Sequence, residues 1–337
     1  MKWYDITGNG HDVVISSRVR FARNLEDFPF TPKLDNSSSK IVVEKVTAAL
    51  ESGLETKLNV TNINAEGQNK HVLVEDHIIS PDFCSDSPLE RVLLTDEGGN
   101  LAIMVNEEDH VRIQAIFPGF ELDKAYEIAC KADKSLSKQL SVAFDENLGY
   151  LTACPTNLGT GLRASVMLHL PGMCAFGYIK NLSSLMTKIG LTVRGIYGEG
   201  SDGKACMYQL SNQITLGISE NDAIEKLKNA VNQIISKERD LRKHLLDKPG
   251  NDLTDRLWRS YGTLKYARKL DTSEAARLIS NVRLGAVCGI IPECKDINML
   301  KLLFEIMPSH ICLMFPDATT PEKRDIYRAN FLRQQLA

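Results

Sequence analysis

The chain has 337 residues, of which 43% are hydrophobic and 25% are charged. These fractions are typical of globular proteins and argue against a disordered chain, and the length favours about two domains. Because 40 basic and 43 acidic residues leave a formal net charge of −3, the composition also argues against a general nucleic-acid-binding protein.

Signals for export, membrane insertion and disulfide bonding are weak in this sequence. The N-terminal residues make a poor signal peptide because charged residues interrupt a short apolar run. No apolar run approaches the roughly 20 residues that a membrane helix needs. The eight cysteines form no C-x-x-C pair, which disfavours a structural zinc site and a disulfide framework. We therefore expect a cytoplasmic protein with reduced thiols and with neither a membrane nor a nucleic acid as a direct partner.

The first part of the chain predicts a helix followed by strands. Residues 38–52 begin with serines and place apolar residues at helical intervals. Three short apolar runs predict neighbouring strands, at 91–95, 101–105 and 111–116. The turn at 97–100 is short enough to join the first two strands as an antiparallel hairpin. A helix near 121–140 should follow.

From 149 to 218 the chain returns to short segments punctuated by glycine, which predict a second antiparallel part of the same sheet. Residues 205–210 and 214–218 are expected to be strands on either side of a turn at 211–213. Ser219 and Asp222 then form a capping signal for a long helix.

A linker at 248–251 is expected to divide the chain into a catalytic domain, residues 1–247, and a helical domain, residues 248–337. Helical patterns follow the linker at 253–269, 273–283, 296–306 and 321–335. The predicted fold class is α+β, with an antiparallel sheet flanked by helices and an α-helical C-terminal domain after it.

Two arginines near the N-terminus suit phosphate binding. Arg18 and Arg20 follow an apolar run, and on a strand both point to the same face. Two guanidinium forks that converge are well matched to triphosphate oxygens. For this segment alone, a solvated edge strand is an equally good interpretation.

An acidic run, Glu107-Glu108-Asp109, lies between the second and third predicted strands. Consecutive carboxylates on a strand point to opposite faces, so only one or two can serve one site. We expect Glu108 to face a bound guanidinium, to orient it and to stabilise its charge while a proton leaves. A plain charged loop is the more common outcome for an isolated acidic run.

Two glycine-rich segments add further candidates. Cys154 is followed by two glycines and Arg163, so nearby positive charge could stabilise a thiolate, although a structural cysteine beside an ordinary turn is the simpler interpretation of this segment alone. Residues 198–204 match G-x-G-x-x-G-K, but a strand follows where a dinucleotide site needs a helix, so we reject that match. A Walker lysine motif and the motifs of ordinary protein kinases are also missing from the sequence. This loop still offers Arg194 and Glu199.

In chain order, the segments S-S-R-V-R, N-E-E-D-H-V-R, C-P-T-N-L-G-T-G-L-R and R-G-I-Y-G-E resemble those of the ATP:guanido phosphotransferase family, which includes the creatine and arginine kinases. The similarity covers about residues 12–220. It implies an enzyme that uses ATP, with Mg²⁺ carried by the nucleotide. Glu108, Glu199 and Cys154 are implied to surround the guanidinium. The implied nucleotide contacts are Ser16, Ser17, Arg18, Val19, Arg20, His77, Arg112, Arg163, Ala164, Ser165, Val166, Met167, Arg194 and Gly195.

Two departures from the creatine and arginine kinases favour a protein substrate. Those enzymes carry a helical domain ahead of the first motif, whereas 15 residues precede Ser16 here, so we expect the region that screens small guanidino substrates to be missing. The C-terminal helices, including residues 255–262, resemble the bacterial protein arginine kinases, and with them the similarity extends over nearly the whole chain. A free-arginine kinase and a non-catalytic phosphoarginine-binding adaptor are the alternatives.

The bacterial subfamily implies several partners. They are protein substrates that carry arginine, an activator protein, protease machinery that removes marked proteins during stress, and a second copy of the chain in a homodimer. Residues 324–329 match the subfamily motif R-D-x-x-R-A, which implies an allosteric phosphoarginine site. Thr320 and Pro321 predict the start of its helix. The implied site residues are Arg324, Asp325, Arg328 and Ala329. From the charges alone, a solvated helix face would be the simpler interpretation.

Overall fold

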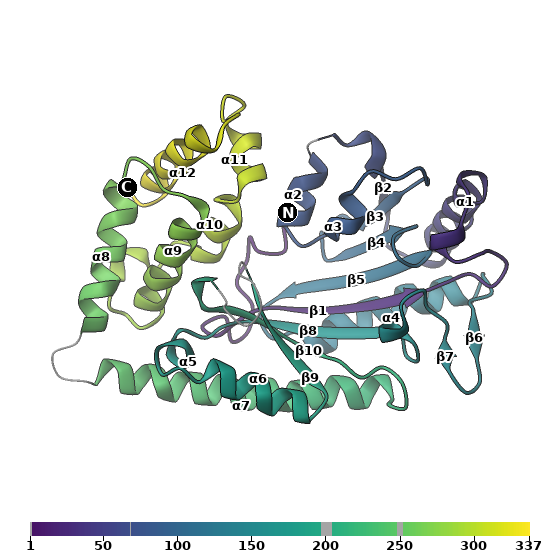
Figure 1. Cartoon of the computed structure of the whole chain (residues 1–337), viewed down its shortest axis with the longest axis horizontal. Helices are drawn as coiled ribbons and strands as arrows, with labels where there is room; N and C mark the ends of the chain where they lie inside the picture. Colours follow the sequence, from purple (N-terminus) through teal and green to yellow (C-terminus); the bar gives the residue numbers. More distant parts are fainter. Residues whose placement is uncertain (1, 68, 197–203, 248–251) are drawn as a thin grey trace. The chain divides into compact units, whose positions relative to one another are not determined.

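The computed structural model describes residues 2–67, 69–196, 204–247 and 252–337. They belong to two compact units, whose elements are labelled in Figure 1. Unit 1 comprises Met1–Trp3, Ser16–Val166 and Ser211–Asn229, and unit 2 comprises Tyr4–Ile15, Met167–Leu210 and Ala230–Ala337.

Unit 1 contains a sheet with the strand order β2-β3-β4-β5-β1-β8. The strands are β1 (Val14–Arg23), β2 (Leu58–Asn62), β3 (Val92–Asp96), β4 (Leu101–Val105), β5 (Val111–Pro118) and β8 (Leu162–His169). Strand β1 pairs antiparallel with β5, and Arg20 lies opposite Gln114. Strands β2, β3, β4 and β5 also pair antiparallel with their neighbours. A separate hairpin consists of β6 (Phe144–Asp145) and β7 (Gly149–Tyr150).

Helices cover the sheet of unit 1 and bury its apolar side chains. The helices are α1 (Asn36–Gly53), α2 (Asn69–Glu75), α3 (Pro81–Cys84) and α4 (Leu122–Ser137), with short 3-10 helices at Thr31–Lys33, Ile63–Ala65 and Pro155–Asn157. Helix α4 packs on β5 and α1 packs on α4. On β1, Val19 and Phe21 are fully buried. Because side chains alternate along a strand, Arg18 and Arg20 point to the opposite face.

Unit 2 contains the strand order β8-β10-β9 and most of the helices of the chain. The strands β9 and β10 are Leu191–Gly195 and Met207–Asn212. The helices are α5 (Pro171–Ala175), α6 (Ile179–Lys188), α7 (Glu220–Leu246), α8 (Asp252–Tyr266), α9 (Thr272–Val287), α10 (Met299–Glu305), α11 (Pro308–Met314) and α12 (Pro321–Gln335), with 3-10 helices at Lys204–Cys206 and Pro292–Cys294. Residues 220–229 of α7 belong to unit 1. Helices α8 and α9 pack together, and α12 packs on α8 and α11.

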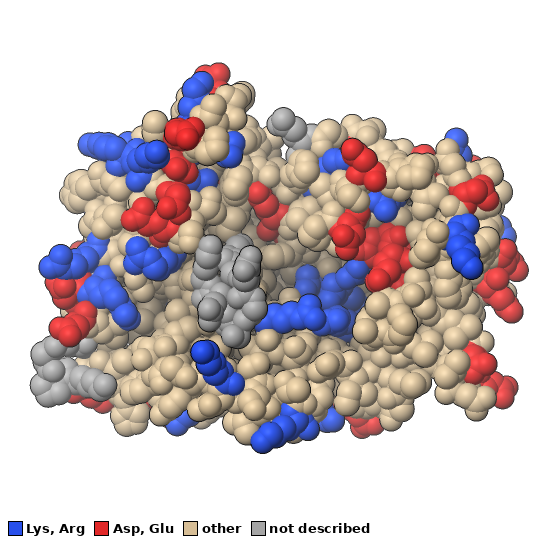
Figure 2. Space-filling view, in the orientation of Figure 1, with Lys and Arg blue, Asp and Glu red and all other residues tan. Residues whose placement is uncertain are grey.

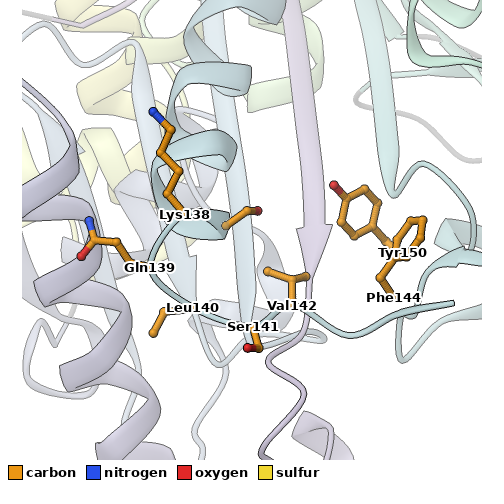
Figure 3. Close-up of a pocket in the computed structure, with 8 residues that line it drawn as sticks. Lys138, Gln139, Leu140, Ser141, Val142, Phe144 and Tyr150 are labelled. Atoms are coloured by element: carbon orange, nitrogen blue, oxygen red, sulfur yellow. The ribbon is translucent and has the colours of Figure 1, made fainter. Parts of the chain in front are cut away.

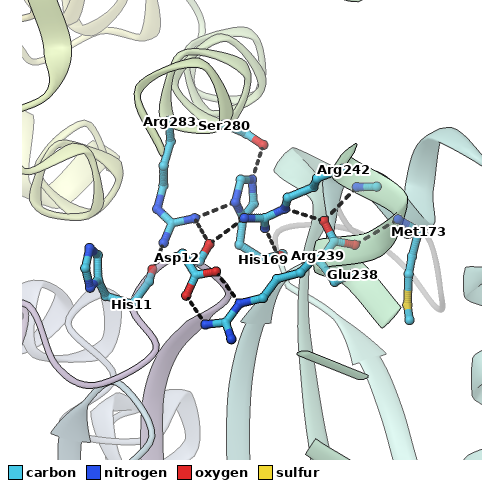
Figure 4. Close-up of polar contacts among 10 residues, drawn as sticks. His11, Asp12, His169, Met173, Glu238, Arg239, Arg242, Ser280 and Arg283 are labelled. Atoms are coloured by element: carbon cyan, nitrogen blue, oxygen red, sulfur yellow. Dashed lines mark hydrogen bonds and ion pairs between the residues drawn. The ribbon is translucent and has the colours of Figure 1, made fainter. Parts of the chain in front are cut away.

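Three arginines of unit 2, Arg239, Arg242 and Arg283, form a group that we call the paired arginine cluster (Figure 4). Arg242 Nε donates to Glu238 at 2.7 Å, and its Nη1 and Nη2 donate to backbone carbonyl oxygens. Arg239 donates twice to the Asp12 carboxylate, at 2.8 and 2.7 Å. These contacts attach helix α7 to the chain segment before β1.

A buried histidine completes this network. Arg283 donates to His169 Nδ1, so the proton of the neutral imidazole lies on Nε2, which donates to Ser280 Oγ at 2.7 Å. Burial and the positive charges of Arg283 and Arg242 hold the pKa of His169 well below its ordinary value. Glu238 accepts two more hydrogen bonds, from the amides of Gly172 and Met173 at 2.8 and 2.9 Å. The polar groups of this cluster therefore find their partners inside unit 2.

The predicted α+β class is confirmed, and most predicted elements are found near their expected places. The predicted capping signal is also confirmed, because the Asp222 amide donates to Ser219 Oγ at 3.1 Å. Strand β2, the β6–β7 hairpin and helices α2, α3, α5, α6 and α11 were not predicted, and α5 and α6 lie where residues 149–218 were expected to belong to the sheet. The linker predicted at 248–251 lies outside the described residues, and the domain boundary placed there stays a prediction. In the described part of the chain, no helix combines the length and apolar character needed to cross a membrane.

The hairpin expected around residues 211–213 is wrong. Ser211 and Asn212 are the last residues of β10, and residues 214–218 are not a strand. The apolar alternation misled the prediction because Ile214 and Leu216 point outward and are about half exposed. Thr215, which lies between them, donates its hydroxyl to Leu158 O at 2.7 Å and so fixes the segment by a side-chain contact instead of a strand ladder.

Candidate active site

Strands β1, β5 and β8 of unit 1 carry four arginines whose charges act on one another. We call Arg18, Arg20, Arg112 and Arg163 the open arginine cluster. Burial, followed by the positive charges of the other three members, lowers the pKa of Arg20 well below its ordinary value. Burial, Arg112 and Arg163 lower the pKa of Arg18 to about 10. Figure 2 shows basic side chains gathered over β1, β5 and β8, with acidic side chains beside them.

Two members of this cluster make hydrogen bonds to serine hydroxyls. Arg18 Nε lies 3.4 Å from Ser165 Oγ, and Arg163 Nη2 lies 3.5 Å from Ser211 Oγ. Within the described residues, Arg20 Nε is buried and has no hydrogen-bond partner. A buried donor without a partner is costly, so this positive site favours an anion that can accept hydrogen bonds.

One carboxylate of the acidic run belongs to this arginine cluster. Glu107 accepts from Arg112 Nη1 at 2.5 and 2.6 Å and also accepts from the Ser80 hydroxyl. Burial of Glu107 opposes ionisation, but Arg112, Ser80 and the Glu108 amide together hold its pKa below the ordinary value. Glu107 therefore fixes the side chain of Arg112.

The third carboxylate of the run, Asp109, joins two loops. It is buried and accepts from Asn24 Nδ2 and from the Ala153 amide, both at 2.6 Å. The next residue, His110, accepts from the Leu25 amide at Nδ1. Asp109 thus holds the turn between β4 and β5 against the segment that leads to Cys154.

Glu108, between these two, is exposed and lies beside a thiol. The Cys154 side chain makes a hydrogen bond with Glu108, and Cys154 Sγ lies 3.0 Å from Thr156 Oγ1. Partial burial and the negative charges of Asp109 and Glu107 raise the pKa of Glu108 above its ordinary value of 4.5. The structure therefore brings Glu108 and Cys154 together, as the sequence-based hypothesis requires.

A cleft of unit 1 is lined by members of both groups. Its lining includes Arg20, Arg112, Arg163 and Glu108. Gly161, which also lines the cleft, has φ +63°, and a Cβ there would lie 2.7 Å from Ala22 O. Only glycine permits this close approach of two chain segments. The site can accordingly accept an anion and a cation in the same cleft.

His77 lies beside the same cluster. Its backbone has φ +59°, and its carbonyl accepts from Gln114 Nε2 at 2.8 Å. Burial and then the positive charge of Arg18 lower the pKa of His77 to about 4, so its ring is neutral near pH 7. A neutral imidazole beside the open arginine cluster is compatible with the expected adenine contact.

The other predicted site residues occupy different places. Ser16, Ser17, Val19, Ala164, Ser165 and Val166 are in unit 1, whereas Met167, Arg194 and Gly195 are in unit 2. Glu199 lies outside the described residues. Ser17 has a structural contact, because its hydroxyl donates to Gly119 O at 2.9 Å and accepts from the Glu121 amide at 3.0 Å.

The residues of the R-D-x-x-R-A motif lie on α12 of unit 2, which begins at Pro321 with Thr320 as its N-cap, as predicted. Arg328 is 1% exposed. It donates to Ile306 O at 2.7 Å, to Leu270 O at 2.8 Å and to Asp325 Oδ1 at 2.7 Å. Ala329 is also buried. Arg328 therefore ties α12 to neighbouring segments, and the phosphoarginine site stays a prediction.

Sequence reasoning missed three residues that position the site, namely Asn24, Glu107 and Ser80. Only Glu107 carried a signal, since it belongs to the acidic run. Within the described residues, no group of three or more histidine, cysteine or carboxylate side chains could hold a metal ion. The carboxylate nearest the arginines, Glu107, already binds Arg112.

Two family models match the chain. Residues 40–241 match the model "ATP:guanido phosphotransferase, C-terminal catalytic domain", and residues 250–337 match the model "Protein-arginine kinase McsB C-terminal domain". Relatives named protein-arginine kinase include those of Brevibacillus brevis and Geobacillus stearothermophilus. They are 44% and 41% identical to the chain, which is covered to 99% in both, and the matches span 94% and 93% of the relatives.

Solved structures of similar fold include a taurocyamine kinase and a lombricine kinase. The substrate-free duplicated taurocyamine kinase from Schistosoma mansoni has a TM-score of 0.63 and 26% identity. That match covers 79% of this chain and 42% of the duplicated enzyme. A lombricine kinase has a TM-score of 0.62 and 24% identity, with coverage of 72% and 71%. The lombricine kinase match supports the fold alone.

Proposed function

The chain belongs to the ATP:guanido phosphotransferase family, and we propose that its open arginine cluster binds the phosphates of ATP while Glu108 and Cys154 hold the acceptor guanidinium. The enzyme is a kinase that phosphorylates arginine side chains of proteins, the activity named for relatives that match it over nearly the full length. The observation that carries the site assignment is the cleft that Arg20, Arg112, Arg163 and Glu108 line together.

The arginines supply electrostatic stabilisation. Burial and then the positive charges of neighbouring arginines lower the pKa values of Arg18 and Arg20, and a triphosphate would neutralise that positive charge. A transferring phosphoryl group spreads negative charge over its oxygens, and fixed guanidinium groups stabilise that charge without reorganising. Mg²⁺ would be held by the phosphate oxygens of the nucleotide, where it neutralises further charge.

Glu108 acts on the acceptor. A free guanidinium has a pKa above about 12, so its nitrogen is a poor nucleophile until it is aligned and loses a proton. In the transfer, a bond forms from this nitrogen to the γ-phosphorus, the bond from that phosphorus to the ADP oxygen breaks, and a proton leaves the nitrogen. The carboxylate of Glu108 orients the guanidinium and stabilises its charge, and the Cys154 side chain beside it supports this alignment.

The resemblance of the sequence implies further features that remain predictions. They are the contacts made by Arg194 and Glu199, the phosphoarginine site on α12, the activator and protease partners, the role in stress, and the homodimer. Of these, the contacts of Arg194 and Glu199 would complete the catalytic site proposed above.

The test is to incubate the purified chain with Mg-ATP and an unfolded protein that contains arginine, then to map acid-labile phosphate by mass spectrometry. A parallel reaction receives free arginine, and Glu108→Gln serves as the inactive control. We expect phosphate on arginine side chains of the protein and none with the control. Phosphate on free arginine only would show a phosphagen kinase, and binding of phosphoarginine without ATP turnover would show an adaptor.

A further inference from the structure

The β6–β7 hairpin of unit 1 carries an exposed apolar surface. Phe144, Leu148 and Leu216 are 58%, 43% and 47% exposed, and we call these three residues the hairpin surface. They line one hollow of unit 1 together with Tyr150. Figure 3 shows a second hollow, where Phe144 and Tyr150 lie next to each other and Ser141 and Val142 form part of the lining. Phe144 therefore lines both hollows.

The ring of Phe144 is held in place. It meets the Tyr150 ring edge to face, with 5.2 Å between the ring centroids. The Arg23 guanidinium lies 3.5 Å from the centroid of the Tyr150 ring, and Arg23 is itself fixed by two 2.8 Å hydrogen bonds to Asp133. A preorganised aromatic side chain loses little conformational freedom when it binds a partner.

The hairpin surface is joined to the segment that forms the acceptor site. The Tyr150 amide donates to Gly159 O at 2.7 Å, and the Thr160 amide donates to Thr215 O at 3.0 Å. A Cβ at Gly159 would lie only 2.2 Å from Thr215 O, so these backbones are in close contact. The segment that contains Gly159 begins at Cys154 and ends at Gly161, which lines the catalytic cleft. One short segment thus contributes to the cleft and supports the hairpin surface.

The charge of the hairpin indicates what binds there. Its turn carries Asp145 and Glu146, and the Asp145 carboxylate accepts from the amides of Asn147 and Leu148 at 2.8 and 2.9 Å. Glu146 is exposed. Negative charge beside exposed apolar side chains is complementary to a cationic polypeptide segment that also displays apolar side chains. A free amino acid offers no such neighbouring side chain.

We propose that the hairpin surface binds the substrate polypeptide on one side of the target arginine and favours apolar side chains there. The proposal rests on the proposed function and adds a substrate preference to it. Gly159 is five residues from Cys154, so at most about 17 Å of chain separates the hairpin contact from the acceptor site. A substrate residue within about five positions of the arginine can span this distance. Because apolar side chains are mostly buried in folded proteins, this substrate preference favours arginines in unfolded segments.

The test compares two unstructured peptides that each contain one arginine. The apolar peptide has leucine or phenylalanine near the arginine, and the serine peptide has serine at the same positions. The parent should have the lower KM for the apolar peptide. Phe144→Ser and Leu216→Ser should each raise that KM by roughly three- to tenfold, since each removes part of an apolar contact area. The kcat, the KM for ATP and the KM for the serine peptide should stay unchanged. Leu185→Ser on α6 of unit 2 is the matched control, because Leu185 is 56% exposed.

The proposal is overturned if the parent has equal KM values for the two peptides. It is also overturned if each of the two variants raises the KM for both peptides alike. Phosphorylation of neither peptide would overturn the proposed function instead. A direct binding experiment then still decides the hairpin surface. The apolar peptide, with a photoreactive phenylalanine analogue at its apolar position, is cross-linked to the catalytically impaired Glu108→Gln variant. We expect cross-links within residues 144–150 or 214–218, and cross-links found only elsewhere would contradict the proposal.

Discussion

The two arginine clusters of this protein differ in what surrounds them. In the paired cluster of unit 2, Arg239 and Arg242 meet the carboxylates of Asp12 and Glu238, and Arg283 donates to His169 and to a backbone carbonyl. In the open cluster of unit 1, the carboxylate of Glu107 pairs with Arg112, while Arg20 keeps a buried donor without a partner in the described structure. In the paired cluster Arg242 and Arg283 are buried and Arg239 is exposed, whereas the four members of the open cluster are half-buried.

The difference teaches that the surroundings of an arginine, rather than its presence, separate a structural role from a binding role. Breaking a buried ion pair leaves an uncompensated charge and is strongly destabilising. Removing one of several like charges that repel one another instead reduces that repulsion in the folded protein. The paired cluster should therefore matter for stability and the open cluster for ATP, and the predictions below test this contrast.

The largest effect on catalysis is expected at Glu108, which belongs to neither arginine cluster. Glu108→Gln should lower kcat by about 10³-fold, because the acceptor loses its charged partner in the transition state. The KM for ATP should change less than about twofold, since the open arginine cluster is intact. Steady-state kinetics with a protein substrate measure both constants. Glu97→Gln, in the exposed turn between β3 and β4, is the matched control, and a similar loss in that variant would contradict the assignment.

Replacing a member of the open cluster tests the binding role. Arg163→Ala should lower kcat/KM for ATP by about 10²-fold, because a bidentate contact to phosphate oxygens is lost. Arg163→Lys should recover only part of this loss, since an ammonium group lacks the planar fork. Arg239→Ala in the paired cluster is the control and should leave kcat/KM for ATP unchanged. A lysine variant that equals the parent would argue against the bidentate contact.

Cys154→Ser should have a smaller effect, about tenfold in kcat, because the thiol supports the alignment made by Glu108 and is not itself phosphorylated. The rate of phosphoryl transfer measured in a single turnover reports this step directly. A complete loss of transfer would assign Cys154 an obligatory role, and an unchanged rate would remove it from the site.

The smallest expected effect concerns pH. Because partial burial and the charges of Asp109 and Glu107 raise the pKa of Glu108, its carboxylate is fully ionised only above that raised value. The kcat should therefore be highest above the raised pKa and should fall as the pH decreases through it, at a pH above 4.5. The residual activity of Glu108→Gln should lack this acidic limb. An identical limb in both proteins would assign it to another group.

Some of these features could be predicted from the sequence and others could not. Period-two alternation correctly placed Arg18 and Arg20 on one face of β1. The roles of the three consecutive carboxylates could not be separated, because their partners Arg112, Ser80, Asn24 and Ala153 come from different parts of the chain. The contacts of Arg328 were equally hidden, since they are made to carbonyl groups of Leu270 and Ile306.

The paired cluster gave no sequence signal at all. Its residues come from four separate segments, around Asp12, His169, Glu238 and Arg283. No single segment carries a recognisable motif, and only the tertiary fold brings the four together. Local patterns therefore predict elements and the face on which a side chain lies, whereas charge pairing over long sequence distances requires the structure.

The most direct test is urea unfolding of the parent, Arg20→Met and Arg242→Met, each with and without Mg-ATP. Arg242→Met should lower the unfolding free energy without nucleotide by about 3–5 kcal/mol, because Glu238 loses its buried partner. ATP should stabilise this variant as much as it stabilises the parent. In Arg20→Met the unfolding free energy without nucleotide should be unchanged or higher. This variant should lose most of the stabilisation by ATP, which in the parent is about 2.7 kcal/mol at an ATP concentration of 100 times Kd. If Arg20→Met is instead destabilised without nucleotide and is stabilised by ATP as the parent is, the account of the open arginine cluster is wrong.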